Sequence, residues 1–188
     1  KEASTHPLER RMVQGFTHAM LGLLPDRATR VLEVGCGEGH QLAKVRGAIS
    51  HGTLVGLDLP DAGLTARWAG AGARFAGGSV TALPFPDASF DLVLALEVLE
   101  HLEDPEAALR EIARVASGSV VLSVPWEPVW RAGNIVRGRY LRTWGNTPGH
   151  CGHFGRRAFV RLVGRHLTVL AVRRPFPWTM VLARAPGR

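Results

Sequence analysis

The chain has 188 residues, of which 46% are hydrophobic and 21% charged, and its formal net charge is +7. This length provides one domain with a full core and is too short for two, and the composition is typical of a globular protein rather than a disordered one. No run of about 18 uncharged apolar residues occurs, and residues 1–7 lack the apolar core of a signal peptide. We therefore expect a single domain over residues 1–188, cytoplasmic and not inserted in a membrane.

Basic residues are concentrated in the last third of the chain. Residues 126–188 contain 12 Arg against the single acid Glu127, whereas residues 1–125 contain 11 Lys and Arg against 15 Asp and Glu. An anionic partner and an ordinary solvated surface explain this distribution equally well. The two cysteines, Cys36 and Cys151, are too few for a disulfide framework and fit a reducing compartment.

Apolar residues recur every four positions over residues 6–24, and this period predicts an amphipathic helix that ends before Pro25. Its apolar stripe consists of Leu8, Met12, Phe16, Met20 and Leu24, with Val13 and Leu23 beside it. We expect this face of the helix to pack on a sheet.

A short apolar strand then runs into a turn rich in glycine. Residues 31–40 read Val-Leu-Glu-Val-Gly-Cys-Gly-Glu-Gly-His. The first four predict a buried parallel strand, while Gly35, Gly37 and Gly39 allow a sharp turn and a close approach to a ligand. A helix from about residue 38 to residue 47 would point free backbone N–H groups at that ligand.

The spacing of these glycines argues against a dehydrogenase. The dinucleotide fingerprint needs Gly-x-Gly-x-x-Gly, but the third glycine is Gly39 and His40 occupies the required position. A second apolar strand, residues 53–57, is followed by Asp58, about 20 residues beyond the turn, where a carboxylate can accept hydrogen bonds from both hydroxyls of a ribose. Asp61 is better placed than Asp58 to cap the next helix.

Three blocks of the sequence resemble the class I S-adenosylmethionine-dependent methyltransferases. Residues 33–39 (Glu-Val-Gly-Cys-Gly-Glu-Gly) are similar to the first motif of that family, and residues 56–58 (Gly-Leu-Asp) to the second. Residues 82–93 followed by 97–105 resemble its small-molecule branch. The resemblance covers residues 28–124, the expected cofactor-binding core, and weakens in the last third, where such enzymes build their acceptor sites.

Alternating strands and helices predict an α/β fold with a doubly wound, mostly parallel sheet. The resemblance implies a Rossmann-like sheet of seven strands in the order 3-2-1-4-5-7-6, with the last strand antiparallel and helices on both faces as three layers. The remaining strands are expected at residues 73–76, 89–96, 119–124, 167–173 and 178–185, and further helices at residues 61–69 and 156–165. Asp104 should cap one more helix that begins at Pro105.

The resemblance also implies S-adenosylmethionine as cofactor. The residues expected to bind it are Glu33, Gly35, Cys36, Gly37, Gly39, Asp58, Leu59, Ser79, Val80, Leu96 and Glu97. Glu33 would fix the glycine turn or reach the amino acid portion of the cofactor, and Glu97 would contact the cofactor or face the acceptor. Ser79 stands where the family usually has an aspartate. Its hydroxyl can still accept a hydrogen bond from adenine, at a cost of about 1 kcal/mol relative to a charged acceptor.

Residues 126–166 are expected to form a lid or insert on the acceptor side. The part from 126 to 154 has no clean periodicity and interleaves four aromatic residues with four arginines: Trp126, Trp130, Tyr140, Trp144, Arg131, Arg137, Arg139 and Arg142. Long irregular segments of compact domains are often lids or binding loops. Aromatic and arginine side chains also stack on nucleic-acid bases, which leaves an RNA surface as the competing interpretation.

Two histidines, His101 and His150, are candidate catalytic residues. A base assists methyl transfer to a hydroxyl, and histidine is suited to that role near neutral pH. His101 closes the motif after the fourth strand, where the family commonly has histidine, although a helix-end histidine bonded to backbone explains it equally well. His150 lies close to Cys151 and His153, but these three have no distant second pair of ligands, so we expect no metal site.

We interpret the sequence as a methyltransferase that methylates an oxygen or nitrogen of a small, possibly anionic metabolite, glycan or natural-product intermediate, as a monomer or homodimer. Two alternatives remain open. One is an RNA methyltransferase that uses the arginine-rich third of the chain, and the other is a non-catalytic protein that binds S-adenosylmethionine.

Overall fold

Seven strands form one sheet in the order β3-β2-β1-β4-β5-β7-β6, which is the order that the resemblance implies. The structure is a computed structural model and describes residues 7–49, 51–61, 63–64, 73–127, 129, 152 and 154–186. The strands are β1 (Arg30–Val34), β2 (Thr53–Asp58), β3 (Arg74–Gly77), β4 (Phe90–Leu96), β5 (Ala116–Pro125), β6 (Thr168–Arg173) and β7 (Trp178–Arg184). Strands β1 to β5 pair in parallel, and β7 runs antiparallel to both β5 and β6.

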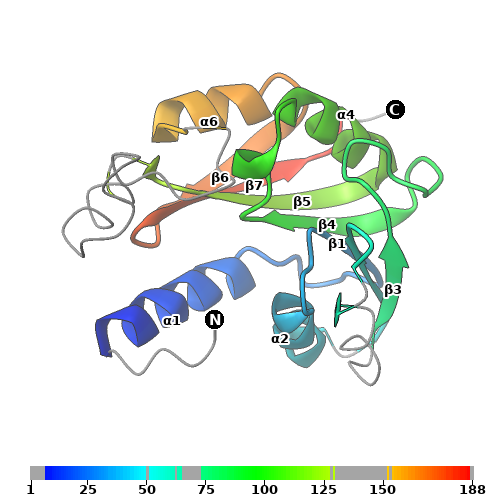
Figure 1. Ribbon diagram of the computed structural model, residues 1–188, viewed down its shortest axis with the longest axis horizontal. Coiled ribbons are helices and arrows are strands. Elements are labelled where there is room, and N and C mark those ends of the chain that lie inside the picture. The colour runs from blue at the N-terminus through cyan, green and yellow to red at the C-terminus, as the bar shows by residue number, and fades with distance from the viewer. Residues whose placement is uncertain are drawn as a thin grey trace.

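Helices cover both faces of this sheet and complete the three layers (Figure 1). The helical elements are α1 (Pro7–Leu21), α2 (His40–Ala48), the short 3₁₀ helix η1 (Leu99–His101), α4 (Pro105–Val115) and α6 (Arg156–Val163). Helices α1 and α2 pack on one face, and α4 and α6 on the other. None of the described helices is long and apolar enough to cross a membrane.

Strand β4 separates the two cores. Val93 and Ala95 point into the cluster under α4 and α6, while Leu92 and Leu94 point into the cluster under α1 and α2, and none of the four is exposed to solvent. Successive side chains of a strand point to opposite faces of its sheet, so a strand buried on both sides needs a continuous apolar run. The sequence of β4 meets that requirement.

Helix α4 begins where the sequence predicts. The Ala107 N–H donates to Asp104 Oδ1 at 2.9 Å, and Pro105 occupies the first turn, where its missing N–H is not needed. The same capping chemistry occurs at Asp61, whose Oδ1 accepts from the Leu64 N–H at 3.0 Å. Most of the helix expected at residues 61–69 lies outside the described residues.

The apolar stripe predicted for the first helix is wrong at Leu8 and Val13, which are 60% and 40% exposed. Phe16 and Met20 are buried, and Met12 is partly buried against the same core. The helix also ends at Leu21, three residues earlier than predicted. The four-residue period therefore continues at the start of the helix beyond the surface on which the helix packs.

Strand β5 begins at Ala116, directly after α4, rather than at residue 119. Its pairing with β4 shifts register between Phe90 and Leu92. A Cβ on Gly118 would lie 2.5 Å from the Asp91 carbonyl oxygen, so the close approach of the two strands at this irregularity requires glycine.

The connection that leads from β3 to β4 is held by one arginine. Arg114 donates to the carbonyl oxygens of Leu83 and Phe85 and to the carboxylate of Glu111, which in turn accepts from the Leu83 N–H at 2.7 Å. This network lies a few residues beyond Ser79 and orders the end of the segment that carries it. Of the lid expected at residues 126–166, positions 128, 130–151 and 153 lie outside the described residues.

Candidate functional site

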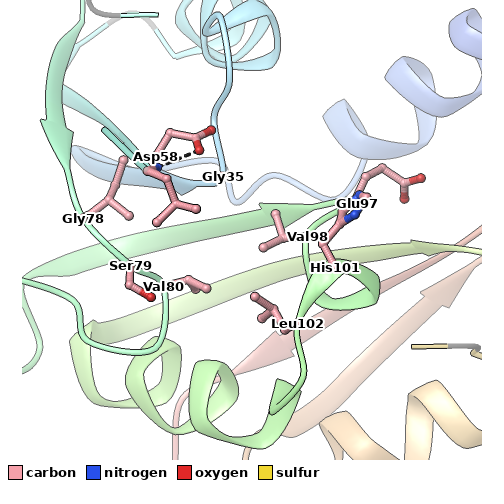
Figure 2. A pocket seen from close by; sticks show the side chains of 11 residues that line it. Gly35, Asp58, Gly78, Ser79, Val80, Glu97, Val98, His101 and Leu102 are labelled. Atoms are coloured by element: carbon pink, nitrogen blue, oxygen red, sulfur yellow. Dashed lines mark hydrogen bonds between the residues drawn. The ribbon is translucent and has the colours of Figure 1, made fainter. Parts of the chain in front are cut away.

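A pocket of about 290 Å³ opens at the carboxyl ends of β1, β2 and β4 (Figure 2). In a doubly wound sheet this edge is where ligands bind. The pocket is lined by Gly35, Leu57, Asp58, Leu59, Gly78, Ser79, Val80, Glu97, Val98, His101 and Leu102. Apolar side chains form much of its wall, and the polar groups stand at a few positions around it.

The glycine turn after β1 has the backbone conformation that its sequence predicts. Gly35, Gly37 and Gly39 have φ values of 66°, 51° and 79°, in the left-handed region that L side chains rarely adopt. The turn is also tightly packed, since a Cβ on Gly35 would lie 2.5 Å from Val98 Cγ2. Only glycine satisfies both conditions at position 35.

Asp58 ends β2 and ties the glycine turn to the pocket. Its Oδ2 accepts from the Gly37 N–H at 2.6 Å, and its Oδ1 accepts from the Leu59 N–H at 2.7 Å. A carboxylate offers about four lone-pair sites, so each oxygen keeps capacity for one further donor. A partly exposed aspartate fixed in this way is ready to accept two hydroxyl groups of a ligand.

Ser79 and Val80 form the wall opposite the glycine turn. The hydroxyl of Ser79 lies 2.8 Å from the hydroxyl oxygen of Thr81 and accepts from the Thr81 N–H at 3.2 Å. When Ser79 donates to Thr81, one lone pair on its oxygen remains for an amino group of a ligand. The structure is therefore compatible with serine in place of the aspartate usual at this position.

Glu97 is held in a conformation that non-glycine residues seldom adopt, with a φ of 60°. Its N–H donates to the Ser123 carbonyl, and its carboxylate accepts from the Ser123 hydroxyl at 2.9 Å and from Trp178 Nε1 at 2.6 Å. Figure 2 shows its carboxylate pointing away from Asp58. These bonds to β5 and β7 support the role of facing the acceptor more than contact with the cofactor.

His101 closes η1 and lies exposed on the pocket wall. Its own N–H donates to the Val98 carbonyl at 3.0 Å. An exposed imidazole at this place can meet an acceptor that enters from solvent. His150, the other catalytic candidate, lies outside the described residues.

Two buried glutamates stand behind the pocket. Burial raises the pKa of Glu33 to about 8, and burial together with the neighbouring carboxylates of Glu97 and Glu127 raises the pKa of Glu100 to about 9. Glu33 also accepts from the Leu42 N–H in the first turn of α2, which supports its role in fixing the glycine turn. Burial likewise raises the pKa of Cys36 to about 12, so its thiol is neutral and not a nucleophile.

These raised pKa values predict that stability falls as pH rises. The unfolded carboxyl groups lose their protons near pH 4.5, whereas folded Glu33 and Glu100 keep theirs to about pH 8 and pH 9. Unfolding therefore releases protons in this window, and each group lowers the free energy of unfolding by about 1 kcal/mol per pH unit. Thermal melts from pH 5 to pH 8 should show a shallower decline for Glu100→Gln than for the native chain. Glu103→Gln, which changes an exposed carboxylate, should leave the slope unaltered, and equal slopes in all three proteins would contradict the expected protonation.

The expected site residues fall into two groups. Seven line the pocket: Gly35, Asp58, Leu59, Ser79, Val80, Glu97 and His101. Glu33, Cys36, Gly39 and Leu96 are buried and Gly37 is half-buried; none of these five is part of the pocket wall. Sequence reasoning missed four lining residues, Leu57, Gly78, Val98 and Leu102, although each lies within one or two positions of an expected one.

The pocket fits S-adenosylmethionine on the chemistry of its residues. Asp58 presents lone pairs for the two ribose hydroxyls, and Ser79 with the apolar side chains of Val80 and Leu102 suits a flat base that carries an amino group. The glycine turn exposes backbone without side chains at Gly35, where a ligand must pass close to the chain. Among the residues that the structure describes, no group of three His, Cys, Asp or Glu side chains is arranged to hold a metal ion.

The chain is similar to known methyltransferases. A family model described as a methyltransferase domain matches residues 32–122. A demethylmenaquinone methyltransferase of Roseiflexus castenholzii is 37% identical over 133 residues, which make up 65% of this chain and 56% of that protein. The 27-O-demethylrifamycin SV methyltransferase of Amycolatopsis mediterranei is 37% identical over 109 residues, 53% of this chain and 39% of that protein.

The fold is likewise shared with solved structures. An S-adenosylmethionine-dependent methyltransferase from Mesorhizobium loti superposes with a TM-score of 0.67 at 20% identity, over 89% of this chain and 96% of that one. The chain spans less than two thirds of the length of the two curated relatives named above. Residues 32–122, which the family model matches, contain the glycine turn, Asp58 and the motif after β4. The chain belongs to the class I S-adenosylmethionine-dependent methyltransferases, whose cofactor is S-adenosylmethionine.

Proposed function

We propose that this protein transfers a methyl group from S-adenosylmethionine to an oxygen or nitrogen of a small molecule. The observation that carries the proposal is the fixed carboxylate of Asp58 beside the glycine turn, in the pocket that has His101 on its wall. The curated relatives named above act on a menaquinone precursor and on a rifamycin by their names. Those names support a small-molecule acceptor for this chain.

The reaction requires the protein mainly to align the methyl donor with the acceptor and to exclude water. When bound, the cofactor supplies a methyl group made electrophilic by its sulfonium. Asp58, Ser79 and the glycine turn would hold the cofactor in the pocket, so that its methyl group is available to the acceptor atom. The proton of the acceptor passes to His101 or to water, and His101 is the described base on the pocket wall. His150 is a second candidate for the same role.

Glu97 would help to shape the acceptor side of the pocket. Its bonds to Ser123 and Trp178 hold a carboxylate at the junction of β4, β5 and β7, and an acceptor would approach the cofactor from this side. The expected lid at residues 126–166 would close over this side. The single-domain organisation, the monomeric or dimeric state and the cytoplasmic location remain predictions.

Transfer of label tests the proposal. The native chain is incubated with methyl-labelled S-adenosylmethionine and a panel of small phenols, alcohols, amines and carboxylic acids, with transfer RNA as a separate arm, and products are analysed by mass spectrometry. We expect label in a small acceptor and, for His101→Gln, a turnover lower by about 100-fold with unchanged cofactor affinity. Label that enters only RNA, or none in any acceptor while the cofactor binds, would contradict a small-molecule methyltransferase.

A further inference from the structure

A groove of about 300 Å³ lies between the first turns of α6 and the end of β6. It is lined by Arg156, Arg157, Val160, Arg161, Val172 and Arg174. Its lining thus combines two apolar side chains with four arginines. No role in the cofactor pocket accounts for this groove, because the two share no lining residue.

Three arginines of the groove have no carboxylate partner among the described residues. Several arginines elsewhere in the described part of the chain pair with carboxylates: Arg30 with Asp91, Arg110 with Asp104, Arg114 with Asp87 and Glu111, and Arg165 with Glu106. Within the described part of the chain, Arg157, Arg161 and Arg174 are exposed and form no ion pair. Like charges concentrated in this way repel one another, and an anion in the groove relieves that repulsion.

One of the four arginines is fixed in place. The guanidinium carbon of Arg156 lies 3.8 Å from the ring centroid of Trp126, which follows directly after β5. Stacking on an indole restrains the side chain and leaves the edge of its planar fork able to bind oxygen atoms. The groove therefore has one preorganised arginine as well as three exposed ones.

The groove opens at the same edge of the sheet as the cofactor pocket. Strands β5 and β6 are both antiparallel to β7, so the end of β6 that leads to Arg174 lies at the edge where β1, β2 and β4 end. Three strand spacings of about 4.8 Å separate β4 from β6, so the groove lies about 15 Å to the side of the near edge of the pocket and farther from Asp58. Figure 1 shows α6 and β6 at this end of the sheet.

We propose that this arginine groove binds the phosphate or diphosphate group of an extended acceptor whose methylated atom lies in the cofactor pocket. Guanidinium forks match phosphate oxygens in pairs, and three or four of them favour a group with more than one negative charge. The groove has a volume of only about 300 Å³, which suits one such group better than a continuous nucleic-acid backbone. The assignment to an acceptor rests on the proposed methyltransferase function, whereas the anion site itself does not.

The first test is calorimetric titration with inorganic pyrophosphate at low ionic strength. We compare the native chain, the double variant Arg161→Gln with Arg174→Gln, and Arg27→Gln, which removes an exposed positive charge outside the groove. We expect the double variant to bind at least about 10-fold more weakly and Arg27→Gln to bind like the native chain. Equal affinity in all three proteins would mean an adventitious ion only and would overturn the proposal.

Two further arms identify the source of the phosphate. A single-stranded RNA and vesicles of anionic phospholipid are titrated against the same proteins. Groove-dependent binding of RNA with a steep salt dependence, or of vesicles, without binding of pyrophosphate would overturn the proposal in favour of a macromolecular surface. Two results together would support the proposal. The native chain binds pyrophosphate more tightly than the double variant does, and the double variant has a raised KM only for the phosphorylated member of each pair of acceptors.

Cofactor affinity separates this proposal from the methyltransferase function. The double variant should bind S-adenosylmethionine as the native chain does, because none of its changed residues lines that pocket. Binding of the cofactor without binding of pyrophosphate would overturn the groove proposal alone. Binding of pyrophosphate without the cofactor would overturn the proposed function and leave the anion site in place.

Discussion

Replacing Asp58 by alanine should lower the affinity for S-adenosylmethionine at least about 100-fold. Two hydroxyl groups that donate to a carboxylate contribute about 1.5 to 3 kcal/mol each, and about 1.4 kcal/mol corresponds to a factor of ten in affinity. The same substitution removes the acceptor of the Gly37 N–H, which braces the turn. Calorimetry with the cofactor and with S-adenosylhomocysteine measures the loss.

Two variants make the result specific to the carboxylate. Asp58→Asn keeps the shape and one acceptor oxygen, so it should fall between the native chain and Asp58→Ala. Asp26→Ala changes an exposed aspartate away from the pocket and should leave affinity unchanged. An Asp58→Ala chain that folds normally and binds the cofactor as tightly as the native chain would contradict the assignment of this residue.

Substituting Gly35 by alanine is expected to have the second large effect, on both stability and cofactor binding. The residue would have to keep a φ of 66°, which costs an L residue about 1 to 2 kcal/mol, and its Cβ would lie 2.5 Å from Val98 Cγ2. Relieving such overpacking costs a further 1 to 3 kcal/mol or so. We expect a free energy of unfolding lower by about 2 to 5 kcal/mol, read from denaturant titration, and no measurable cofactor binding, because Val98 and Gly35 both line the pocket.

Gly37→Ala is the matched control for this substitution. Its φ of 51° imposes the same kind of backbone strain, but a Cβ there would meet nothing within 4 Å. The variant should therefore lose about 1 kcal/mol of stability and keep most of its cofactor affinity. Equal losses of stability and cofactor affinity in both variants would mean that position 35 requires glycine for its backbone conformation alone and not for the contact with Val98.

The fold follows from sequence wherever a local signal and a tertiary requirement coincide. The continuous apolar run of β4 predicts a strand buried on both faces, and the cap at Asp104 fixes the start of α4; both agree with the structure. The stripe of α1 misleads at Leu8 and Val13, because periodicity reports which face of a helix is apolar and not how far its partner surface extends.

The site was predictable in its motifs and less so in its details. Gly35 and Asp58 are revealed by turn chemistry and by their distance along the chain. The hydrogen bond from Trp178 to Glu97 joins residues 81 positions apart, and no local sequence pattern predicts it. The arginine groove was also not predictable from local sequence. The composition shows the excess of arginine, but these arginines lie together at the end of β6 only because α6 packs there.

The central claim is that the pocket at the ends of β1, β2 and β4 binds S-adenosylmethionine. Calorimetric titration of the native chain with this cofactor tests it most directly. We predict one binding site per chain with a dissociation constant in the micromolar range, and comparable binding of S-adenosylhomocysteine. A folded chain that shows no binding at millimolar concentrations of either compound would contradict the claim.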